Sequence, residues 1–447
     1  MKILHLPGSC LWNYSKSDFE DIFGYFEPDV LLTSDMNRSQ KRKIDGNFSY
    51  ESIHLDEVKS VKQRYIGEEV LLIVEEMDPA SRIEMSEIDD REVILLTDLI
   101  KEEMDPKSFE YRLVNTSLIE KIKGNIDDLH ILSTAIEAGK SPFYEDVKVH
   151  GLGLSDDLGD PKIPCVITDE GIHIETLNAN KVGISAVPGL GRRFSSQLER
   201  HGVRTRSDLC SIDPDDILEC DGIGPYRSTK WISSAKAIEE SEVYRIEEND
   251  LGDKHRIFID IETDSLNPSI IWHIGVFDDE VGEYEYFLEK KPDKKDRIIK
   301  DFLERLEENI CKDSVLLAWY GEKFDFEHLE NFIRRYAPEK ISIWNKVEKE
   351  DFMRWTDRHA ALPCRSSKLD SVARRLGYEP EITGLDGSDV GRIYSEYMID
   401  GDREPDWKEL KLYGKEDVME MKFIYDRIVQ APMLYDMGEV EKRYSRK

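Results

Sequence analysis

Two acidic side chains, separated by a single residue, lie in an otherwise apolar segment of the chain. The segment reads Ile257-Phe258-Ile259-Asp260-Ile261-Glu262-Thr263, and its apolar character predicts a β-strand. Residues two apart share one face of a strand, so Asp260 and Glu262 should project together beside Phe258. Two carboxylates on so apolar a strand repel each other and lose hydration unless a cation lies between them. Hard divalent cations prefer oxygen ligands, so the pair predicts a metal site.

Two further acidic residues occupy positions that a solvated surface does not explain. Asp325 follows the buried apolar run 315–319 and is expected to begin a helix. Asp417 lies one turn after Tyr413 on another expected helix, in the middle of its apolar stripe. That stripe consists of Leu410, Tyr413, Met421, Ile424 and Ile428. A charge at the centre of a core-facing stripe indicates a functional role.

These motifs together resemble the DEDD family of 3′–5′ exonucleases (the DnaQ-like, RNase H-like superfamily), in the subgroup marked by Tyr-x-x-x-Asp. The first motif is Asp-Ile-Glu-Thr at 260–263, the second is Phe-Asp at 324–325, and the third runs from Tyr413 to Asp417. The segments 366–372 and 376–378 are similar to the YprB-type branch, also called RNase H-like domain 2. The resemblance covers about residues 254–430. It has one departure, because Tyr320 stands where the second motif of the family usually has Asn.

The resemblance implies a metal-dependent 3′–5′ exonuclease that hydrolyses terminal phosphodiesters by a two-metal mechanism. It implies that Asp260, Glu262, Asp325 and Asp417 hold two Mg²⁺ or Mn²⁺ ions and that Tyr413 orients the attacking water. The ordinary pKa of tyrosine is near 10, so Tyr413 is not expected to accept a proton at neutral pH. Two alternatives stay open. One is a non-catalytic nucleic-acid-binding scaffold with a degenerate nuclease domain, and the other is an RNA-processing exoribonuclease.

A short glycine-containing element occurs twice before this region, each time ahead of a polar segment that can form a helix. The copies read Val187-Pro188-Gly189-Leu190-Gly191 and Cys220-Asp221-Gly222-Ile223-Gly224. A turn of this kind directs backbone N–H groups, together with the helix dipole, toward an anion such as a DNA phosphate. The two copies resemble a tandem helix-hairpin-helix module. The expected contacts to nucleic acid come from Gly189, Gly191, Arg192, Arg193, Gly222, Gly224 and Arg227.

Local charge supports this hypothesis for the first copy. Residues 189–206 contain five arginines against the single acid Glu199. Such contacts would be independent of base sequence and sensitive to salt. The alternative is a structural turn in a small helical domain. With the hairpins, DNA rather than RNA is the expected partner.

The elements that must position these residues predict an α/β multidomain protein. Residues 1–150 are expected to form an α/β domain of unknown role, with strands at 3–6, 30–32, 70–74 and 93–96 and helices at 18–26 and 126–138. An ordinary turn is expected at 7–9, although Pro-Gly-Ser there also suggests a phosphate loop. The remaining parts are connecting loops and short strands at 151–182, the all-α hairpin module at 183–242, an acidic linker at 239–254, the nuclease domain at 254–430 and a C-terminal tail at 431–447.

Within the nuclease domain, the order of elements is that of a ribonuclease H-like mixed sheet with flanking helices. Strands are expected at 256–262, 270–277 and 283–288, followed by a helix at 296–310 and a buried strand at 315–319. Trp272, His273, Trp319 and Phe324 are expected mainly in the core. His328 could approach the metal site, and His359 and Arg365 could contact phosphate.

Composition limits the class of protein. The 447 residues include 94 acidic and 62 basic side chains, a net charge of −32, and 39% hydrophobic residues. The acidity is explained either by a solvation adaptation, for example to high salt, or by acidic site and partner surfaces. The six cysteines contain no Cys-x-x-Cys pair, which argues against a disulfide framework or a zinc ribbon. No run approaches the ~20 apolar residues of a membrane span, and Met1–Pro7 does not resemble a signal peptide. We therefore expect a cytoplasmic protein without a membrane partner.

Overall fold

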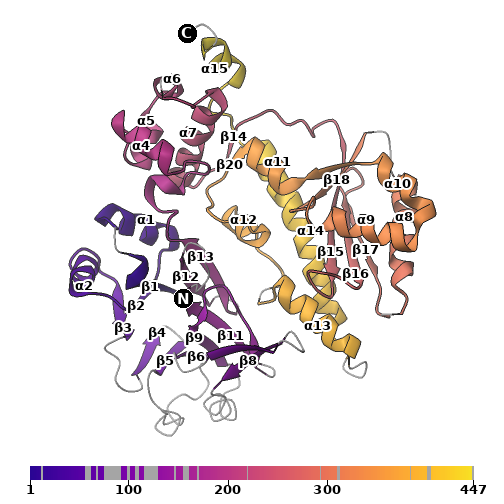
Figure 1. The fold of residues 1–447 in the computed structure, drawn as a ribbon, viewed down its shortest axis with the longest axis horizontal. Helices are drawn as coiled ribbons and strands as arrows, with labels where there is room; N and C mark the ends of the chain where they lie inside the picture. The colour runs from indigo at the N-terminus through magenta and orange to yellow at the C-terminus, as the bar shows by residue number, and fades with distance from the viewer. Residues whose placement is uncertain are drawn as a thin grey trace. The chain divides into compact units, whose positions relative to one another are not determined.

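The computed structural model divides the chain into two compact units, Met1–Ala186 and Val187–Lys447 (Figure 1). It describes residues 1–11, 14–55, 62–66, 69–74, 92–97, 101–105, 110–114, 129–144, 147–154, 161–168, 171–218, 220–291, 293–309, 313–382, 384–399 and 404–444. Across these described ranges, no helix combines the length and the apolar character that crossing a membrane would require.

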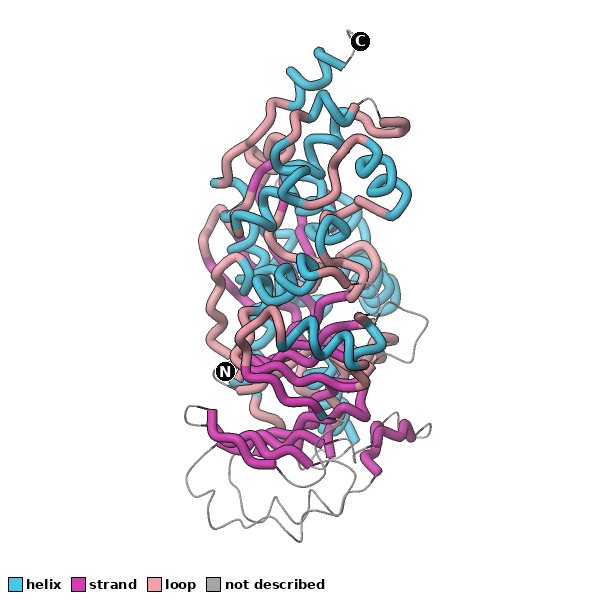
Figure 2. Tube along the Cα trace, turned by 90° about the vertical axis from the view of Figure 1, so that its left-hand side faces the viewer, coloured by secondary structure: helices cyan, strands magenta, loops and turns pink. Residues whose placement is uncertain are grey.

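The described residues of the N-terminal unit form two larger sheets, whose strands are drawn in magenta in Figure 2. The first has the order β13-β12-β1-β2-β3. Its strands β1, β2 and β3 are parallel, and helices α1 and α2 connect them along the chain. Its elements are β1 (Lys2–Pro7), α1 (Lys16–Phe26), β2 (Val30–Ser34), α2 (Arg38–Asp45), β3 (Glu51–His54), β12 (Lys162–Ile167) and β13 (His173–Asn178). The second has the order β10-β11-β9-β6-β5-β4, from β4 (Lys62–Ile66), β5 (Glu69–Val74), β6 (Glu92–Thr97), β9 (Leu129–Glu137), β10 (Phe143–Tyr144) and β11 (Val147–Gly153). Strands β7 (Lys101–Asp105) and β8 (Glu110–Val114) pair antiparallel in a separate two-stranded sheet.

The prediction of a helix at 126–138 is wrong for its described part. Residues 129–137 form strand β9, which pairs in parallel with β6 and with β11. Ile131 and Leu132 are adjacent, and both are completely buried. A central parallel strand is covered on both faces, so its apolar residues run consecutively and do not show the alternation of a half-buried strand.

The short strands expected within the connecting segment 151–182 are present as β12 and β13. They belong to the first sheet, because β12 pairs antiparallel with β1. The N-terminal unit therefore continues to Ala186. The expected turn at Gly8 is present and begins a short 3₁₀ helix, Gly8–Cys10. A Cβ on Gly8 would lie 2.4 Å from the carbonyl oxygen of Asp35, so this glycine serves close backbone packing.

The second unit begins with a helical segment that contains the two glycine turns. Its helices are α4 (Arg192–Arg200), α5 (Arg206–Ser211), α6 (Pro214–Ile217) and α7 (Pro225–Glu240). The C-terminal residues, expected to form a tail, instead form α15 (Met437–Tyr444) and pack on α6 and α7. Val440 of α15 is buried, and the Thr229 hydroxyl donates a hydrogen bond to the Met437 sulfur at 2.9 Å. Burial of the Val440 side chain stabilises the packing of α15 on α6 and α7.

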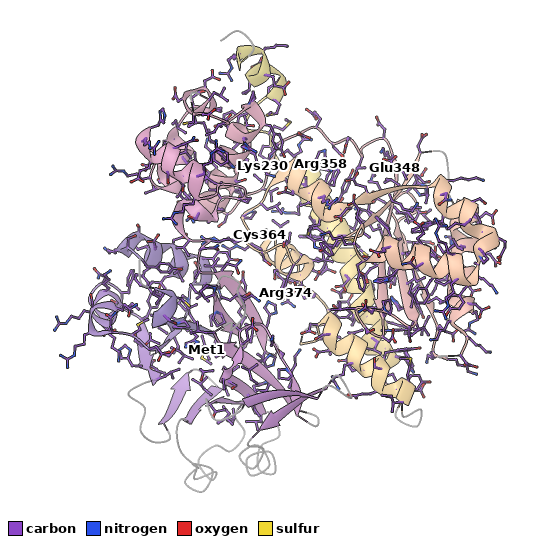
Figure 3. All side chains as sticks on the ribbon, in the orientation of Figure 1. Met1, Lys230, Glu348, Arg358, Cys364 and Arg374 are labelled. Atoms are coloured by element: carbon purple, nitrogen blue, oxygen red, sulfur yellow. The ribbon has the colours of Figure 1, made fainter. Side chains whose placement is uncertain are left out.

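The expected acidic linker at 239–254 is not an extended connection. Val243, Ile246 and Leu251 within it are buried, and β14 (Tyr244–Arg245) pairs with β20 (Ala360–Ala361) of the following domain. The helical segment also contacts that domain directly, because the ammonium of Lys230, which is labelled in Figure 3, forms an ion pair with Asp357 at 2.9 Å. The two parts of the second unit are thus joined by packing, strand pairing and charge.

The C-terminal domain is built on a five-stranded mixed sheet of order β17-β16-β15-β18-β19. Strands β15 (His255–Thr263), β16 (Ile271–Asp278) and β17 (Glu283–Leu288) form an antiparallel meander. Strand β18 (Ser314–Ala318) runs parallel to β15, and β19 (Glu348–Asp351) runs parallel to β18. The other elements are α8 (Lys295–Asn309), α9 (Asp325–Tyr336), α10 (Ile341–Lys346), α11 (Phe352–His359), α12 (Leu369–Arg375), α13 (Gly387–Ile399) and α14 (Trp407–Gln430). The strands and the helix predicted here are confirmed to within about one residue at each end.

The two faces of this sheet are covered by different helices (Figure 1). Ile257, Ile259 and Ile261 pack on one face against α8, α9 and α10. Phe258 packs on the opposite face against α11 and α14. The side-chain alternation expected from the sequence is therefore present, and Asp260 and Glu262 face the side that carries α14.

Candidate metal centre and hairpin repeat

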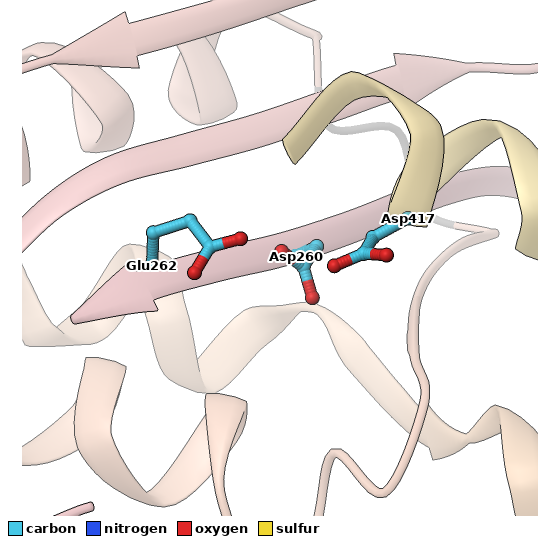
Figure 4. Close-up of side chains that lie close together, drawn as sticks. All are labelled: Asp260, Glu262 and Asp417. Atoms are coloured by element: carbon cyan, nitrogen blue, oxygen red, sulfur yellow. The ribbon is translucent and has the colours of Figure 1, made fainter. Parts of the chain in front are cut away.

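Three carboxylates from two elements converge on the face of the sheet that carries α14. Asp260 and Glu262 come from β15 and Asp417 from α14, and one oxygen of each lies within 4.8 Å of the others (Figure 4). Glu262 is buried, whereas Asp260 and Asp417 each keep part of their surface accessible to solvent. The group thus has a closed inner end and a side that a ligand can reach.

Two glycines allow α14 to approach the sheet closely enough for this convergence. Gly275 pairs with Asp260 across β15 and β16, and a Cβ on it would lie 3.0 Å from the Val418 side chain. A Cβ on Gly414, in α14, would lie 2.5 Å from the ring of His273. Side chains at these positions would push the helix outward. Because Gly275 and Gly414 have no side chain, α14 can pack close enough to bring Asp417 next to Asp260 and Glu262.

Asp325 lies beside this group without joining it. It is the first residue of α9, and its Oδ1 accepts a hydrogen bond from the backbone N–H of Ile261 at 3.2 Å. Its side chain is 3% exposed. The structure therefore brings three of the four predicted ligands together, and it places the fourth against the backbone between Asp260 and Glu262. A metal-ligand role of Asp325 stays a prediction.

The electrostatics of the group favour protonation or a bound cation. Removal from solvent raises the pKa of Asp260 and Glu262 well above the usual range, and the Asp417 carboxylate raises it further. Burial also raises the pKa of Asp325 and of Asp417 to about 7. Four carboxylates with raised pKa values in one place compete for protons in the absence of metal.

The donor set fits a hard divalent cation. Asp260 Oδ2 is buried and has no hydrogen-bond partner. In the described part of the chain, no lysine or arginine forms an ion pair with Asp260, Glu262 or Asp417. Carboxylate oxygens that lack both hydrogen bonds and counter-charges match the ligands that Mg²⁺ and Mn²⁺ prefer. The three residues could therefore hold a divalent ion and so relieve their mutual repulsion.

Tyr413 and a further acid adjoin the group on α14. Tyr413 lies one turn before Asp417 on α14, and burial and the Asp417 carboxylate raise the pKa of Tyr413 well above its ordinary value. One turn after Asp417, Glu420 is 3% exposed, and burial raises its pKa to about 9, with Asp417 as the next cause. Sequence reasoning missed Glu420, although its place beside Asp417 on the same helical stripe was a signal for it.

The metal-free protein is expected to lose stability as the pH rises. The pKa of Asp325 and of Asp417 is about 7 in the folded protein, against about 4 in an unfolded chain. Between these values the folded state holds more protons than the unfolded state, so the free energy of unfolding falls as the pH increases. Calorimetry after chelation should show a Tm that decreases from about pH 5 to about pH 8. Saturating Mn²⁺ should abolish the decrease, whereas a metal-free Tm that increases over this range would contradict the raised pKa values.

Most other candidate residues from the sequence have structural roles. Trp272 and His273 are completely buried, as expected, and burial lowers the pKa of His273 to about 3. The Trp319 indole donates to the Ser367 carbonyl at 3.0 Å. Phe324 lies against the core and contacts His328 edge to face, and His359 stacks on Trp355. A phosphate contact of Arg365 stays a prediction.

The two glycine turns have the same local structure. Leu190 N–H donates to the Val187 carbonyl at 3.1 Å, and Ile223 N–H donates to the Cys220 carbonyl at 3.2 Å. Gly189 and Gly222, at the same place in each turn, have φ values of +75° and +80°, which glycine adopts without strain. Gly191 and Gly224 then precede α4 and α7, and neither helix has a side chain capping its N-terminus. The repeat in sequence is thus a repeat in structure, and the first backbone N–H groups of both helices lack a side-chain acceptor.

The two turns are packed against each other through aromatic rings. Phe194 of α4 contacts Trp231 of α7, with ring centroids 5.1 Å apart. The Arg227 guanidinium lies 5.0 Å from the centre of the Phe194 ring, and that of Arg193 lies 5.5 Å from it. Arg192 and Arg193 are exposed at the first turn of α4. Asp221 of the second turn forms an ion pair with Arg193 at 3.8 Å. The exposed Arg192 and Arg227 leave the surface of the two turns with a net positive charge. We call it the hairpin surface.

Comparison with known proteins shows partial similarity. Among proteins with curated descriptions, none matches this sequence. A structure of exonuclease I that suggests how processivity is achieved aligns at 15% identity with a TM-score of 0.24, over 39% of this chain and 44% of that one. E. coli exonuclease I in complex with a dT13 oligonucleotide aligns at 15% identity and a TM-score of 0.23, over 36% and 43%. The zinc-bound E. coli ExoI–ssDNA complex aligns at 12% identity and 0.24, over 43% of each chain. This chain thus spans less than half the length of each of these structures.

A family model gives a more definite result for the C-terminal part. The model of the RNase_H superfamily matches residues 257–429. That range contains the strand with Asp260 and Glu262, the start of α9 at Asp325, and the part of α14 that carries Asp417. The match to the RNase H superfamily model therefore covers the part of the chain that holds all three of the grouped carboxylates.

Proposed function

We propose that this protein is a metal-dependent nuclease, a 3′–5′ exonuclease that hydrolyses terminal phosphodiesters of DNA. The observation that carries the proposal is the convergence of Asp260, Glu262 and Asp417, from two separate elements, inside an RNase H superfamily domain. Carboxylates grouped without counter-charges are costly unless they serve a cation. A site of this kind suits phosphodiester hydrolysis better than nucleic-acid binding, because an acidic surface repels phosphate unless metal is present.

The residues of the chain then have distinct roles in the proposed reaction. Asp260, Glu262 and Asp417 would hold two Mg²⁺ or Mn²⁺ ions together with Asp325, which also fixes the strand through the Ile261 N–H. When bound, such ions supply Lewis-acid chemistry, lowering the pKa of water and stabilising charge on the phosphate. Tyr413 would orient the attacking water from its place one turn before Asp417 on α14. With its pKa raised, Tyr413 stays protonated and acts as a donor.

The proposal extends to the hairpin surface, as a tandem helix-hairpin-helix module that holds the nucleic-acid backbone. Its support is the repeated turn at Gly189 and Gly222, the uncapped helix N-termini and the exposed Arg192 and Arg193. Backbone N–H groups and arginines suit phosphates, which carry no sequence information. A cytoplasmic role in DNA repair or nucleic-acid processing is consistent with such binding.

The proposed activity is tested by release of nucleotides from labelled strands. Single-stranded DNA and RNA of equal sequence, labelled at the 5′ end, are incubated with the full chain in Mn²⁺ or in chelator. The proposal predicts that the labelled DNA shortens stepwise from its 3′ end in Mn²⁺ only. Faster degradation of RNA than of DNA would favour the exoribonuclease alternative. If neither DNA nor RNA is degraded, with or without Mn²⁺, but both are still bound, the scaffold alternative is favoured.

The hairpin surface is expected to bind phosphate without regard to base sequence. The double substitution Arg192→Ala with Arg193→Ala should weaken binding to different DNA sequences equally. It should also reduce the slope of log affinity against log salt by about 2, since two phosphate contacts are lost. Binding is measured by fluorescence anisotropy in chelator, which prevents hydrolysis. The matched control is Arg334→Ala with Arg335→Ala, an adjacent exposed pair on α9, and an equal effect of both pairs would contradict a specific role of the hairpins.

A further inference from the structure

Tyr320 is a large aromatic side chain left on the surface between β18 and the start of α9. Its side chain is 44% exposed, whereas the apolar residues of the preceding strand are completely buried. Its backbone has φ +58°, in the left-handed region that residues other than glycine, asparagine and aspartate rarely occupy. Holding a tyrosine there costs about 1 kcal/mol or more, so the surrounding structure must impose the conformation.

The turn around Tyr320 shows how the conformation is imposed. Gly321 N–H donates to the Ala318 carbonyl at 3.3 Å, and Phe326 N–H donates to the Gly321 carbonyl at 2.9 Å. A Cβ on Gly321 would lie 2.8 Å from both the Ala318 side chain and the Phe326 ring. The backbone on either side of Tyr320 is therefore closely packed and hydrogen-bonded. It cannot relax to bury the tyrosine ring.

The same turn leads directly into the metal centre. Strand β18 runs parallel to β15, with Leu317 paired to Phe258, so both strands end at the same edge of the sheet. Tyr320 follows the end of β18 at this edge, where Asp260 and Glu262 end β15. Five residues after Tyr320, Asp325 accepts the Ile261 N–H. The position of Tyr320 relative to the acidic strand is thus fixed through a short, rigid connection.

A positive charge accompanies the exposed ring. The Lys323 ammonium lies 5.5 Å from the centre of the Tyr320 ring, and Lys323 is itself exposed. An aromatic face beside an ammonium group matches the two parts of a nucleotide, a flat base and an anionic phosphate. A single exposed tyrosine is ordinary on a protein surface. One held in a strained backbone next to a phosphodiester site is explained by a ligand that uses the ring.

We propose that Tyr320 stacks on the terminal base of the strand that enters the metal centre, with Lys323 near its phosphate. This inference rests on the proposed nuclease function and adds a substrate-binding residue to it. Stacking accepts every base, so this contact holds a terminal nucleotide without selecting sequence.

The first experiment measures stacking without hydrolysis. An oligonucleotide with 2-aminopurine as its 3′-terminal base is bound to the protein in Ca²⁺, and base stacking is followed by the fluorescence of the probe. We expect a fluorescence change with the wild type and with Tyr320→Phe, and its loss with Tyr320→Gly. The glycine variant also relieves the left-handed backbone, so a loss of signal in a variant at least as stable as the wild type reports the missing ring and not unfolding.

The second experiment uses the reaction itself. Base–aromatic stacking supports an increase in KM of about 5- to 150-fold for Tyr320→Gly, with a smaller change in kcat. An oligonucleotide with an abasic 3′ end should show the same high KM with the wild type and with the variant. If the wild type hydrolyses DNA but the variant keeps its KM and its fluorescence change, the role of Tyr320 is refuted and the nuclease function stands. If the wild type hydrolyses nothing, the nuclease function fails, and a fluorescence change that needs the tyrosine ring still supports end binding at Tyr320.

Discussion

Asp260→Asn is expected to reduce metal-dependent hydrolysis by about 10²- to 10⁴-fold while the protein remains folded. Asparagine has nearly the same shape but carries no charge, and Asp260 is the carboxylate whose Oδ2 is buried without a partner. The substitution removes an anionic metal ligand. It also removes one member of a repulsive group, so the metal-free variant should melt at a higher temperature than the metal-free wild type.

This pair of effects separates a metal ligand from a merely structural residue. Release of labelled nucleotides measures the first effect, and calorimetry in chelator measures the second. The control is Asp301→Asn, the same change at an exposed position on α8, which should alter neither quantity. A folded Asp260→Asn protein with undiminished activity would remove the metal centre from the proposed mechanism. Lower stability in chelator would show instead that Asp260 does not suffer the inferred repulsion.

Gly414→Ala is the second substitution with a large expected effect, although it changes no charge. The added Cβ would lie 2.5 Å from the His273 ring, and helix α14 must therefore move away from the sheet. Overpacking of this kind costs about 1–3 kcal/mol of stability. A displacement of Asp417 by about 1 Å should reduce activity by roughly 10²-fold. Denaturant unfolding and the nucleotide-release assay measure the two losses.

The cause can be tested by making room for the added methyl group. In the double variant Gly414→Ala with His273→Ala, α14 can return to the sheet, so much of the lost activity should be restored. Gly24→Ala serves as the control, because Gly24 lies in helix α1 and a Cβ there meets nothing within 4 Å. It should be neutral or stabilising. Equal losses in the single and double variants would show that the spacing of α14 is not set by contact with His273.

The parts of the metal centre that could be predicted are those that depend on the residue pattern within a single strand or helix. The alternation of Phe258, Asp260 and Glu262 with isoleucines decided which face each side chain would occupy. Asp417 was found because a charge interrupted an apolar stripe of helical period. Both inferences need only the geometry of one element. They are therefore available without knowledge of the fold.

The parts that could not be predicted depend on contacts between elements. Nothing in the sequence near Gly414 shows that it lies against His273, since the two residues meet only when α14 packs on β16. The sequence predicts a helix where strand β9 lies, because a strand covered on both faces has no alternating pattern. Tertiary packing decided both.

The arrangement of the sheet and α14 also determines when the metal centre can exist. Strand β15 is the first strand of its domain, and α14 is the helix that ends the matched region. During synthesis, Asp260 and Glu262 on β15 are therefore made well before Asp417 on α14, and until then they repel each other without the third carboxylate. The three carboxylates can hold a metal ion only after α14 has packed on the sheet. We therefore expect the proposed nuclease activity to appear only after α14 has docked on the strands that support the site.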